Sequence, residues 1–286
     1  MIRSEQAGAG AVLRPRRLHR AAMLLFIVVV MLLSAGCNKL KARDQMVKGV
    51  QSYKSAQYEA AIEHFKNAIV LDPGLLNAHL YLATAYAQQY IPGADTPENN
   101  KYAEQAISEY KSVLERDPKN VTGVKSIAYL YMNMKRFDDS KQYYRKAIEL
   151  DPNDPEAYYS VAVIDWTQAY QPRMEERAKL GLKPTDLLKD KKVCALLKDK
   201  NSEVVKDGID MLNKALQLRT DYDDAMAYLN LMYREKADLE CDDPQQQAAD
   251  IQTANDWVDK TMATKKKKAE KKTGPGGIVL DEEQKQ

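Results

Sequence analysis

The sequence predicts an all-α fold, a solenoid of helical hairpins with inserted loops or helices along one edge. Its main signal is a repeated pattern: a small residue, a bulky one four positions later, and another small one three positions after that. These spacings place the three residues on one helical face. A second amphipathic pattern follows each copy, so the repeating unit is a pair of helices. The copies are AIEHFKNAIVLDP (61–73), AISEYKSVLERDP (106–118), SKQYYRKAIELDP (140–152) and GIDMLNKALQLRT (208–220).

The second pattern has a bulky residue, a small residue for close helix contact, and an aromatic residue three positions later. It occurs at Leu82-Ala83-x-x-Tyr86 and Ile127-Ala128-x-x-Tyr131, and in diverged form at Val161-Ala162-x-x-Asp165 and Leu229-Asn230-x-x-Tyr233, with Gly49 as the small residue of the first copy. The paired helices resemble the tetratricopeptide repeat (TPR), in which L-[GA]-x-x-Y is followed by A-x-x-x-[FY]-x-x-A-x-x-x-x-P. The match extends over most of residues 42–234. The resemblance implies a solenoid of about five repeats, over 37–262, that binds proteins.

Proline marks the ends of three copies, because it disfavours a helical conformation of the residue before it. Pro118 and Pro152 lie 34 residues apart, which is one repeat period. The other intervals are longer, and each excess falls between the two helices of a repeat, along one edge of the solenoid. In the second excess, Gly181 and Pro184 favour a helical insertion, with a degenerate sixth repeat as the alternative. The three insertions are expected near 88–99, 167–201 and 236–247.

Residues 1–36 have the features of an export signal. The basic stretch RPRRLHR (14–20) precedes the uncharged AAMLLFIVVVMLLSAG (21–36). The end of this run, Leu33-Ser34-Ala35-Gly36-Cys37, resembles the lipobox of bacterial lipoproteins. The resemblance implies cleavage before Cys37, a lipid carrying fatty acids such as palmitate on that residue, and a membrane-anchored protein facing the periplasm or cell exterior. Asn38 favours the outer membrane if there are two, and an uncleaved signal anchor is the alternative.

Charge argues against nucleic acid as a partner. The net charge is +2, but it is unevenly spread along the chain. Basic residues are concentrated in the signal and in a lysine run from Lys260 to Lys272, and the chain between these two segments is net acidic. The segment 263–286 has no apolar periodicity and is predicted to be a disordered tail. Its lysines either contact an anionic surface such as phospholipid headgroups or are simply solvated.

No catalytic motif, metal-ligand spacing or cofactor-binding string occurs in the sequence. His64 and His79 lie within helical patterns, without cysteines or acid pairs at metal-ligand spacing. Acidic residues at Asp151/Asp154 and Asp221/Asp223/Asp224 fall at helix starts, where carboxylates cap free amides. We therefore expect no enzyme, no cofactor and no metal site.

The TPR resemblance implies a groove lined by the first helix of each repeat. Aromatic and methionine side chains there are typical of protein-binding surfaces. Capture of a chaperone C-terminal carboxylate is disfavoured, because apolar or aromatic residues occupy those positions. The alternative is that the insertions or the C-terminal helix cover these residues as ordinary core. The predicted groove residues are Met46, Val50, Tyr53, Leu80, Tyr129, Met132, Tyr159, Val163 and Trp166.

Together these features predict a cell-envelope scaffold or assembly lipoprotein that acts through protein–protein interaction. The alternative is a tether that uses lipidated Cys37 and the basic tail to join two surfaces. Cys194 and Cys241 fall in insertions of adjacent repeats on the same edge. In an oxidising compartment such a pair is expected to form a disulfide, and two unrelated buried thiols are the alternative.

Overall fold

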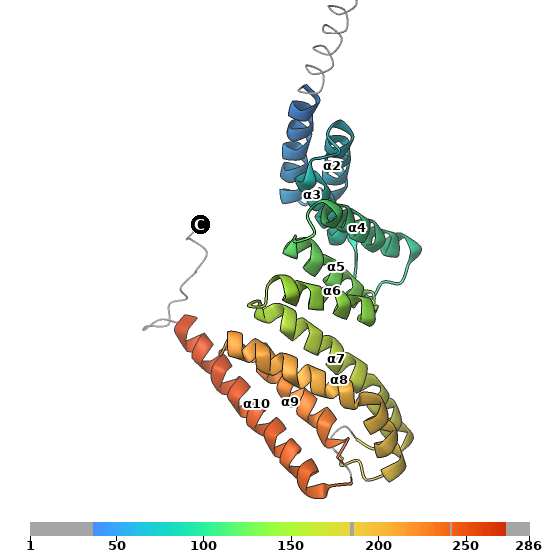
Figure 1. The fold of residues 1–286 in the computed structure, drawn as a ribbon, viewed down its shortest axis with the longest axis vertical. Helices are drawn as coiled ribbons and strands as arrows, with labels where there is room; N and C mark the ends of the chain where they lie inside the picture. The colour runs from blue at the N-terminus through green and yellow to red at the C-terminus, as the bar shows by residue number, and fades with distance from the viewer. Residues whose placement is uncertain (1–36, 184–185, 241, 273–286) are drawn as a thin grey trace, which may run out of the picture. The chain divides into compact units, whose positions relative to one another are not determined.

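The computed structural model describes residues 37–183, 186–240 and 242–272. This part of the chain consists of α-helices joined by short connections (Figure 1). The predicted signal (1–36), Cys241 and the tail beyond 272 lie outside the described residues. A first helix covers 37–54. It is followed by α2 (Tyr58–Leu71), α3 (Leu76–Gln89), α4 (Pro97–Arg116), α5 (Val121–Asn133), α6 (Phe137–Leu150), α7 (Pro155–Lys179), α8 (Lys191–Leu218), α9 (Asp223–Ala237) and α10 (Pro244–Lys272).

Short polar side chains cap the starts of several helices. The Asn120 side chain accepts a hydrogen bond from the Gly123 amide at 2.9 Å, and Asp154 accepts one from the Glu156 amide at 3.0 Å. Asp190 caps the start of α8 by accepting from two backbone amides. These bonds satisfy amides that have no partner inside the helix. The expected capping role is thus observed for Asp154, whereas α9 begins without a side-chain cap.

The described chain forms two compact units, each with its own helix pairs. Unit 1 comprises 37–90 and 98–109, and unit 2 comprises 91–97 and 110–272. In unit 1 the Phe65 ring is fully buried and stacks on Tyr81 with centroids 5.6 Å apart. Gly49 is needed opposite it, because an added Cβ would lie 2.5 Å from the Phe65 ring. The first repeat therefore uses glycine for the close helix contact that the sequence pattern predicts.

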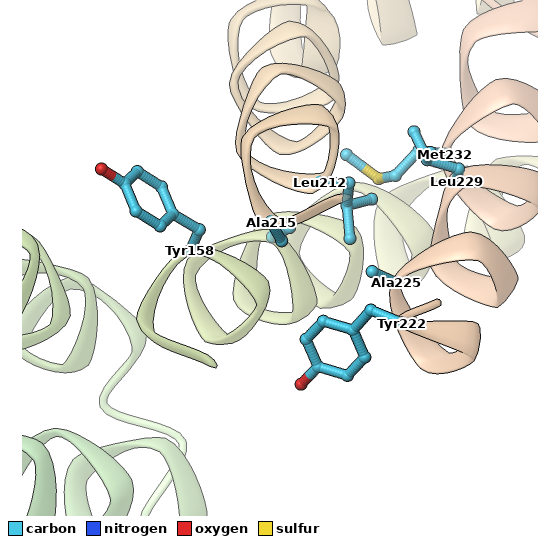
Figure 2. Packing of buried hydrophobic residues seen from close by; sticks show 8 residues of the cluster. Tyr158, Leu212, Ala215, Tyr222, Ala225, Leu229 and Met232 are labelled. Carbon is cyan, nitrogen blue, oxygen red and sulfur yellow. The ribbon is translucent and has the colours of Figure 1, made fainter. Parts of the chain in front are cut away.

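The core of unit 2 is built where α7, α8 and α9 meet. Leu212 of α8 and Leu229 and Met232 of α9 are completely buried there (Figure 2). Gly208 allows α8 to approach closely, since an added Cβ would lie 2.0 Å from the Met232 side chain and 3.1 Å from Asp165 Cβ. The small residue at the start of the fourth copy therefore has a packing role, as the repeat pattern predicts.

The segment 167–201 is a long helical hairpin rather than an extra helix pair. α7 has 25 residues and α8 has 28, whereas α6 has 14. A single connection joins α7 to α8. α7 and α8 pack side by side (Figure 1). The other two connections between paired helices include the non-helical residues 90–96, and 238–240 with 242–243. Each departure from the 34-residue period is thus located within a pair.

A buried ion-pair network fastens this hairpin to the end of α9. Arg177 is fully buried and donates to the Asp238 carboxylate at 2.7 Å, and to the Lys183 and Asp186 carbonyl oxygens at 2.5 Å each. Arg173 donates to Asp238 at 2.6 Å and to Glu235 at 3.2 Å. Burial raises the pKa of Glu235 to about 7, against the effect of the arginines. The network joins residues more than sixty positions apart in the sequence.

A second charged cluster joins α6, α7 and α8. Asp165 occupies the aromatic position of the repeat pattern, is fully buried, and pairs with Lys141. Lys141 also lies 3.5 Å from Asp207, which pairs with Arg145 at 2.5 Å. Burial raises the pKa of Asp165 to about 7, whereas the hydrogen bond from Lys141 acts in the opposite direction. A carboxyl group thus replaces the aromatic ring at this position, and Lys141 from the neighbouring helix offsets only part of the cost of burying its charge.

The lysine run differs from its prediction as a disordered tail, because α10 continues to Lys272. Lysine is a good helix former, and tertiary contacts support the extension. Lys268 pairs with Asp223 at 2.5 Å, and Thr264 Oγ1 lies 3.5 Å from the sulfur of Met226. Lys260 lies over the Trp257 ring, 4.0 Å from its centroid. Two of the lysines are therefore engaged within the chain.

The predicted disulfide between Cys194 and Cys241 stays a prediction, since Cys241 is outside the described residues. Cys194 is fully buried, and its sulfur lies 3.6 Å from the carbonyl oxygen of Leu239, two positions before Cys241 in the sequence. We expect mass spectrometry of the non-reduced protein to find both cysteines in one linked peptide. Alkylation of both residues without prior reduction would contradict it.

Candidate protein-binding surface

The nine predicted groove residues lie on the first helices of the repeats, but few are fully accessible. Tyr129 is the exposed one, with 53% of its surface accessible, and the other eight are half-buried. Met46, Val50, Tyr53 and Leu80 belong to unit 1, and Tyr129, Met132, Tyr159, Val163 and Trp166 belong to unit 2. Each helix therefore presents these side chains at its surface edge, partly covered by neighbours.

In unit 2, aromatic rings from α7 and α9 form one cluster, which we call the α7/α9 aromatic cluster. It consists of Tyr159, Trp166 and Tyr170 of α7 with Tyr222 and Tyr228 at α9. Ring centroids are 5.1 Å apart for Tyr159–Tyr222, 5.4 Å for Tyr159–Tyr228 and 5.5 Å for Trp166–Tyr228. Such separations are typical of favourable aromatic pairs. The five rings are thus in continuous contact, from buried Tyr222 to Tyr170, which is exposed.

The cover over Tyr159 and Trp166 comes from the neighbouring first helix, α9, through these ring contacts. Both residues also pack against the unit 2 core, which Trp257 of α10 reaches as well. Burial raises the pKa of Tyr159 and Tyr228, so their hydroxyls stay neutral at physiological pH. At the edge of the cluster, Tyr170 keeps 38% of its surface accessible. The structure is thus intermediate between an open groove and the predicted alternative of an ordinary core.

Tyr129 on α5 differs from the cluster because its ring is free to meet a partner. Its backbone is well held, since the Asn133 side chain donates to the Tyr129 carbonyl at 2.8 Å. One turn earlier on the helix, Lys125 pairs with Asp154 at 2.6 Å. A rigid backbone that carries an exposed aromatic ring is suited to protein recognition, because little entropy is lost on binding.

In unit 1 the corresponding residues make local contacts. Tyr53 meets Tyr58 edge-on with ring centroids 5.4 Å apart, and its hydroxyl accepts a hydrogen bond from Gln88 at 3.1 Å. The histidines have structural partners: His64 lies 2.9 Å from the Gln45 side chain, and His79 lies 2.6 Å from Glu109. Each histidine thus has a side-chain hydrogen-bond partner within unit 1.

The acidic, histidine and cysteine side chains of the described residues are dispersed or held in ion pairs. No group of three or more histidine, cysteine or acidic residues is placed there to hold a metal ion. The carboxyl groups with a strongly raised pKa, Asp165 and Glu235, are buried against Lys141 and Arg173. Their burial between helices keeps them away from a substrate. They are explained as parts of ion-pair networks.

Sequence reasoning missed Tyr170, Tyr222 and Tyr228 as parts of this surface. Tyr170 could have been found, since it follows Trp166 by four positions and so lies on the same helical face. The tyrosines of α9 could not, because their contact with α7 depends on how successive repeats pack. The missing information is the rotation of one helix against the next.

Cys37 is exposed, carries a free thiol, and is the first described residue of the helix over 37–54. Among the helices of the described chain, none has the length and apolar character needed to cross a membrane. The predicted cleavage and lipidation concern the segment before Cys37, which is outside the described residues.

Comparison with known proteins agrees with the repeat architecture. The tetratricopeptide-repeat family model matches residues 125–154, from within α5 to the residue before α7. No curated protein sequence matches the chain. Among solved structures, MamA 41-end from Desulfovibrio magneticus RS-1 has a TM-score of 0.55 at 15% identity, covering 80% of this chain and 98% of that one. A crystal structure of MamA protein has a TM-score of 0.54 at 14% identity, covering 80% and 94%. The chain thus carries a tetratricopeptide repeat signature at residues 125–154, and its all-helical fold of paired helices is similar to that of MamA.

Proposed function

We propose that this protein is a cell-envelope lipoprotein that holds a protein partner against the first helices of its repeats. The observation that supports this most is Tyr129, an exposed aromatic ring on a rigid helix of the unit that also carries the α7/α9 aromatic cluster. Large aromatic side chains supply much of the binding energy at protein interfaces. The partner is a peptide or helix whose apolar side chains pack against these rings.

The Tyr129→Ala variant is expected to weaken capture of this partner by about 1–3 kcal/mol, the usual cost of truncating an aromatic anchor. Its melting temperature should stay close to that of the natural protein, because the ring is exposed. The measurement is quantitative capture of membrane proteins on the purified lipoprotein. Trp166→Ala is a poorer probe, since this ring packs against Tyr228 and its loss would also cost stability.

A photo-crosslinking amino acid at position 129 tests the same surface without removing any partner. Leu196 on α8 is a matched control, since it is 50% exposed. We expect the crosslinker at position 129 to capture a discrete protein. The crosslinker at position 196 should not capture that same protein. Identical adducts at both positions, or none at 129, would overturn the proposed surface.

The location part of the proposal rests on the sequence Ser34-Ala35-Gly36-Cys37 and on the exposure of Cys37. Without this thiol no thioether to lipid can form. The Cys37→Ala variant is therefore expected to lose incorporation of labelled palmitate and to keep its signal. Gel mobility and fatty-acid labelling in the producing cell measure both. Normal processing of the variant would show that the segment is an ordinary signal or anchor.

A further inference from the structure

One side of α10 carries a stripe that no other described helix covers. α10 packs along α9 and lies at the edge of unit 2 (Figure 1). Val258 is 38% exposed and Met262 is 64% exposed, although both are apolar. They belong to a series spaced alternately by four and three residues, which follows one helical face. Its members are Ile251, Asn255, Val258, Met262, Lys265 and Ala269.

The spacing is that of a helix that packs lengthwise on another helix, because it keeps one seam in contact over several turns. Ile251 is half-buried, and the members that follow it are exposed. A single exposed apolar residue needs no explanation, but three of the exposed members, Val258, Met262 and Ala269, are apolar and lie on one face, which indicates an interface. The stripe therefore fits a helical partner better than a small ligand.

Charge along α10 is divided between its two halves. Asp256, Asp259 and Lys260 are exposed before Met262, and Lys265, Lys266, Lys267 and Glu270 are exposed after it, so the first half is net acidic and the second half is net basic. Asp259 and Lys266 flank the stripe on the same side, seven positions apart, and neither has an ion-pair partner in the described chain. Two such helices placed side by side in parallel would bring lysines against lysines. In antiparallel orientation each acidic half meets a basic half.

We propose that α10 is a homodimer interface at which two copies of this chain pair through antiparallel α10 helices. A two-fold axis near the middle of the stripe makes the surface self-complementary, as a symmetric dimer requires. Val258 and Met262 form the apolar centre, and Lys265 and Lys266 of one copy lie beside Asp259 of the other. The helix over 37–54 of another copy is a poor occupant, because its exposed Lys39, Lys41 and Arg43 would repel the lysines of α10.

Crosslinking of the full-length protein in its own membrane tests the pairing. Met262→Cys lies near the two-fold axis, so a short bismaleimide should join two copies and double the apparent mass on a denaturing gel. Lys267→Cys is the matched control, since it is also exposed on α10 but points away from the stripe. Both variants keep the same native cysteines. Equal crosslinking at the two positions, or none at 262, would overturn the dimer.

Charge reversal separates a second copy from any other occupant. In the Met262→Cys protein, Lys265→Glu with Lys266→Glu should reduce the crosslinked dimer by roughly tenfold, since several charge pairs become repulsive. Adding Asp259→Lys to the same chain should restore the dimer, because lysine at 259 of one copy again lies beside glutamates of the other. An anionic membrane or an acidic foreign protein as the occupant would give no restoration, and this result would also overturn the proposal. The partner surface at Tyr129 is unaffected by these variants, so the two proposals fail independently.

Discussion

Replacement of Arg177 by methionine is expected to destabilise unit 2 by about 3–5 kcal/mol, the usual cost of removing one partner from a buried ion pair. Arg177 has no accessible surface, and it donates to Asp238 and to the carbonyl oxygens of Lys183 and Asp186. Methionine fills much of the volume but donates nothing. Asp238 would then share Arg173 with Glu235, and both carbonyls would lose their donor.

The matched control is Arg219→Met, which removes an exposed pair with Glu156 at 3.1 Å. Exposed pairs contribute at most about 1 kcal/mol. Thermal and urea unfolding of both variants measure the difference. Since the lost donor also holds the connection between α7 and α8, trypsin should cut Arg177→Met faster between 180 and 190. Equal stability of the two variants would show that the network does not fasten the hairpin.

A double-mutant cycle measures how far the two groups act together. Asp238→Asn removes the charge that Arg177 and Arg173 share, so adding it to Arg177→Met should cost much less than its separate effect. Strict additivity would show that Arg177 contributes through packing alone.

The second large effect is a pH dependence that originates at Asp165. Burial raises its folded-state pKa to about 7, whereas an unfolded aspartate titrates near about 3.9. Between these two pH values the carboxyl group is protonated in the folded state and ionised in the unfolded state. This group therefore stabilises the fold most below pH about 4. Its contribution is lost as the pH rises through about 7. A carboxylate deep between α6, α7 and α8 therefore becomes costly in alkaline solution.

Asp165→Asn is expected to remove this dependence. Relative to the natural protein, the variant should gain roughly 2–4 kcal/mol between pH 4 and pH 8, following the size of the shift. Lys141 keeps Asp207 as a neighbour at 3.5 Å, which limits the direct cost of the change. Unfolding free energies at several pH values measure the difference between the two proteins. Asp199→Asn, on the exposed side of α8, is the control, and a parallel pH profile for Asp165→Asn would contradict the prediction.

Local sequence was sufficient for the helix pairs themselves. Their apolar residues recur every three or four positions, and the stops at Pro73, Pro118 and Pro152 depend on the chain next to them. The all-helical class and the resemblance to tetratricopeptide repeats follow from this pattern. The positions of Gly49 and Gly208 were also predictable, since a close helix contact needs a small residue wherever the pattern repeats.

Tertiary structure decided everything that depends on how one pair lies against the next. Arg177 and Asp238 are far apart in sequence, and no spacing rule links them. The contact of Tyr228 with Trp166, which half-covers the predicted groove, depends on the rotation between α7 and α9. The lysine run looked disordered because it lacks apolar periodicity, yet Asp223 of another helix holds Lys268. Local periodicity is encoded within a few residues, whereas these contacts arise only when distant helices are brought together by packing.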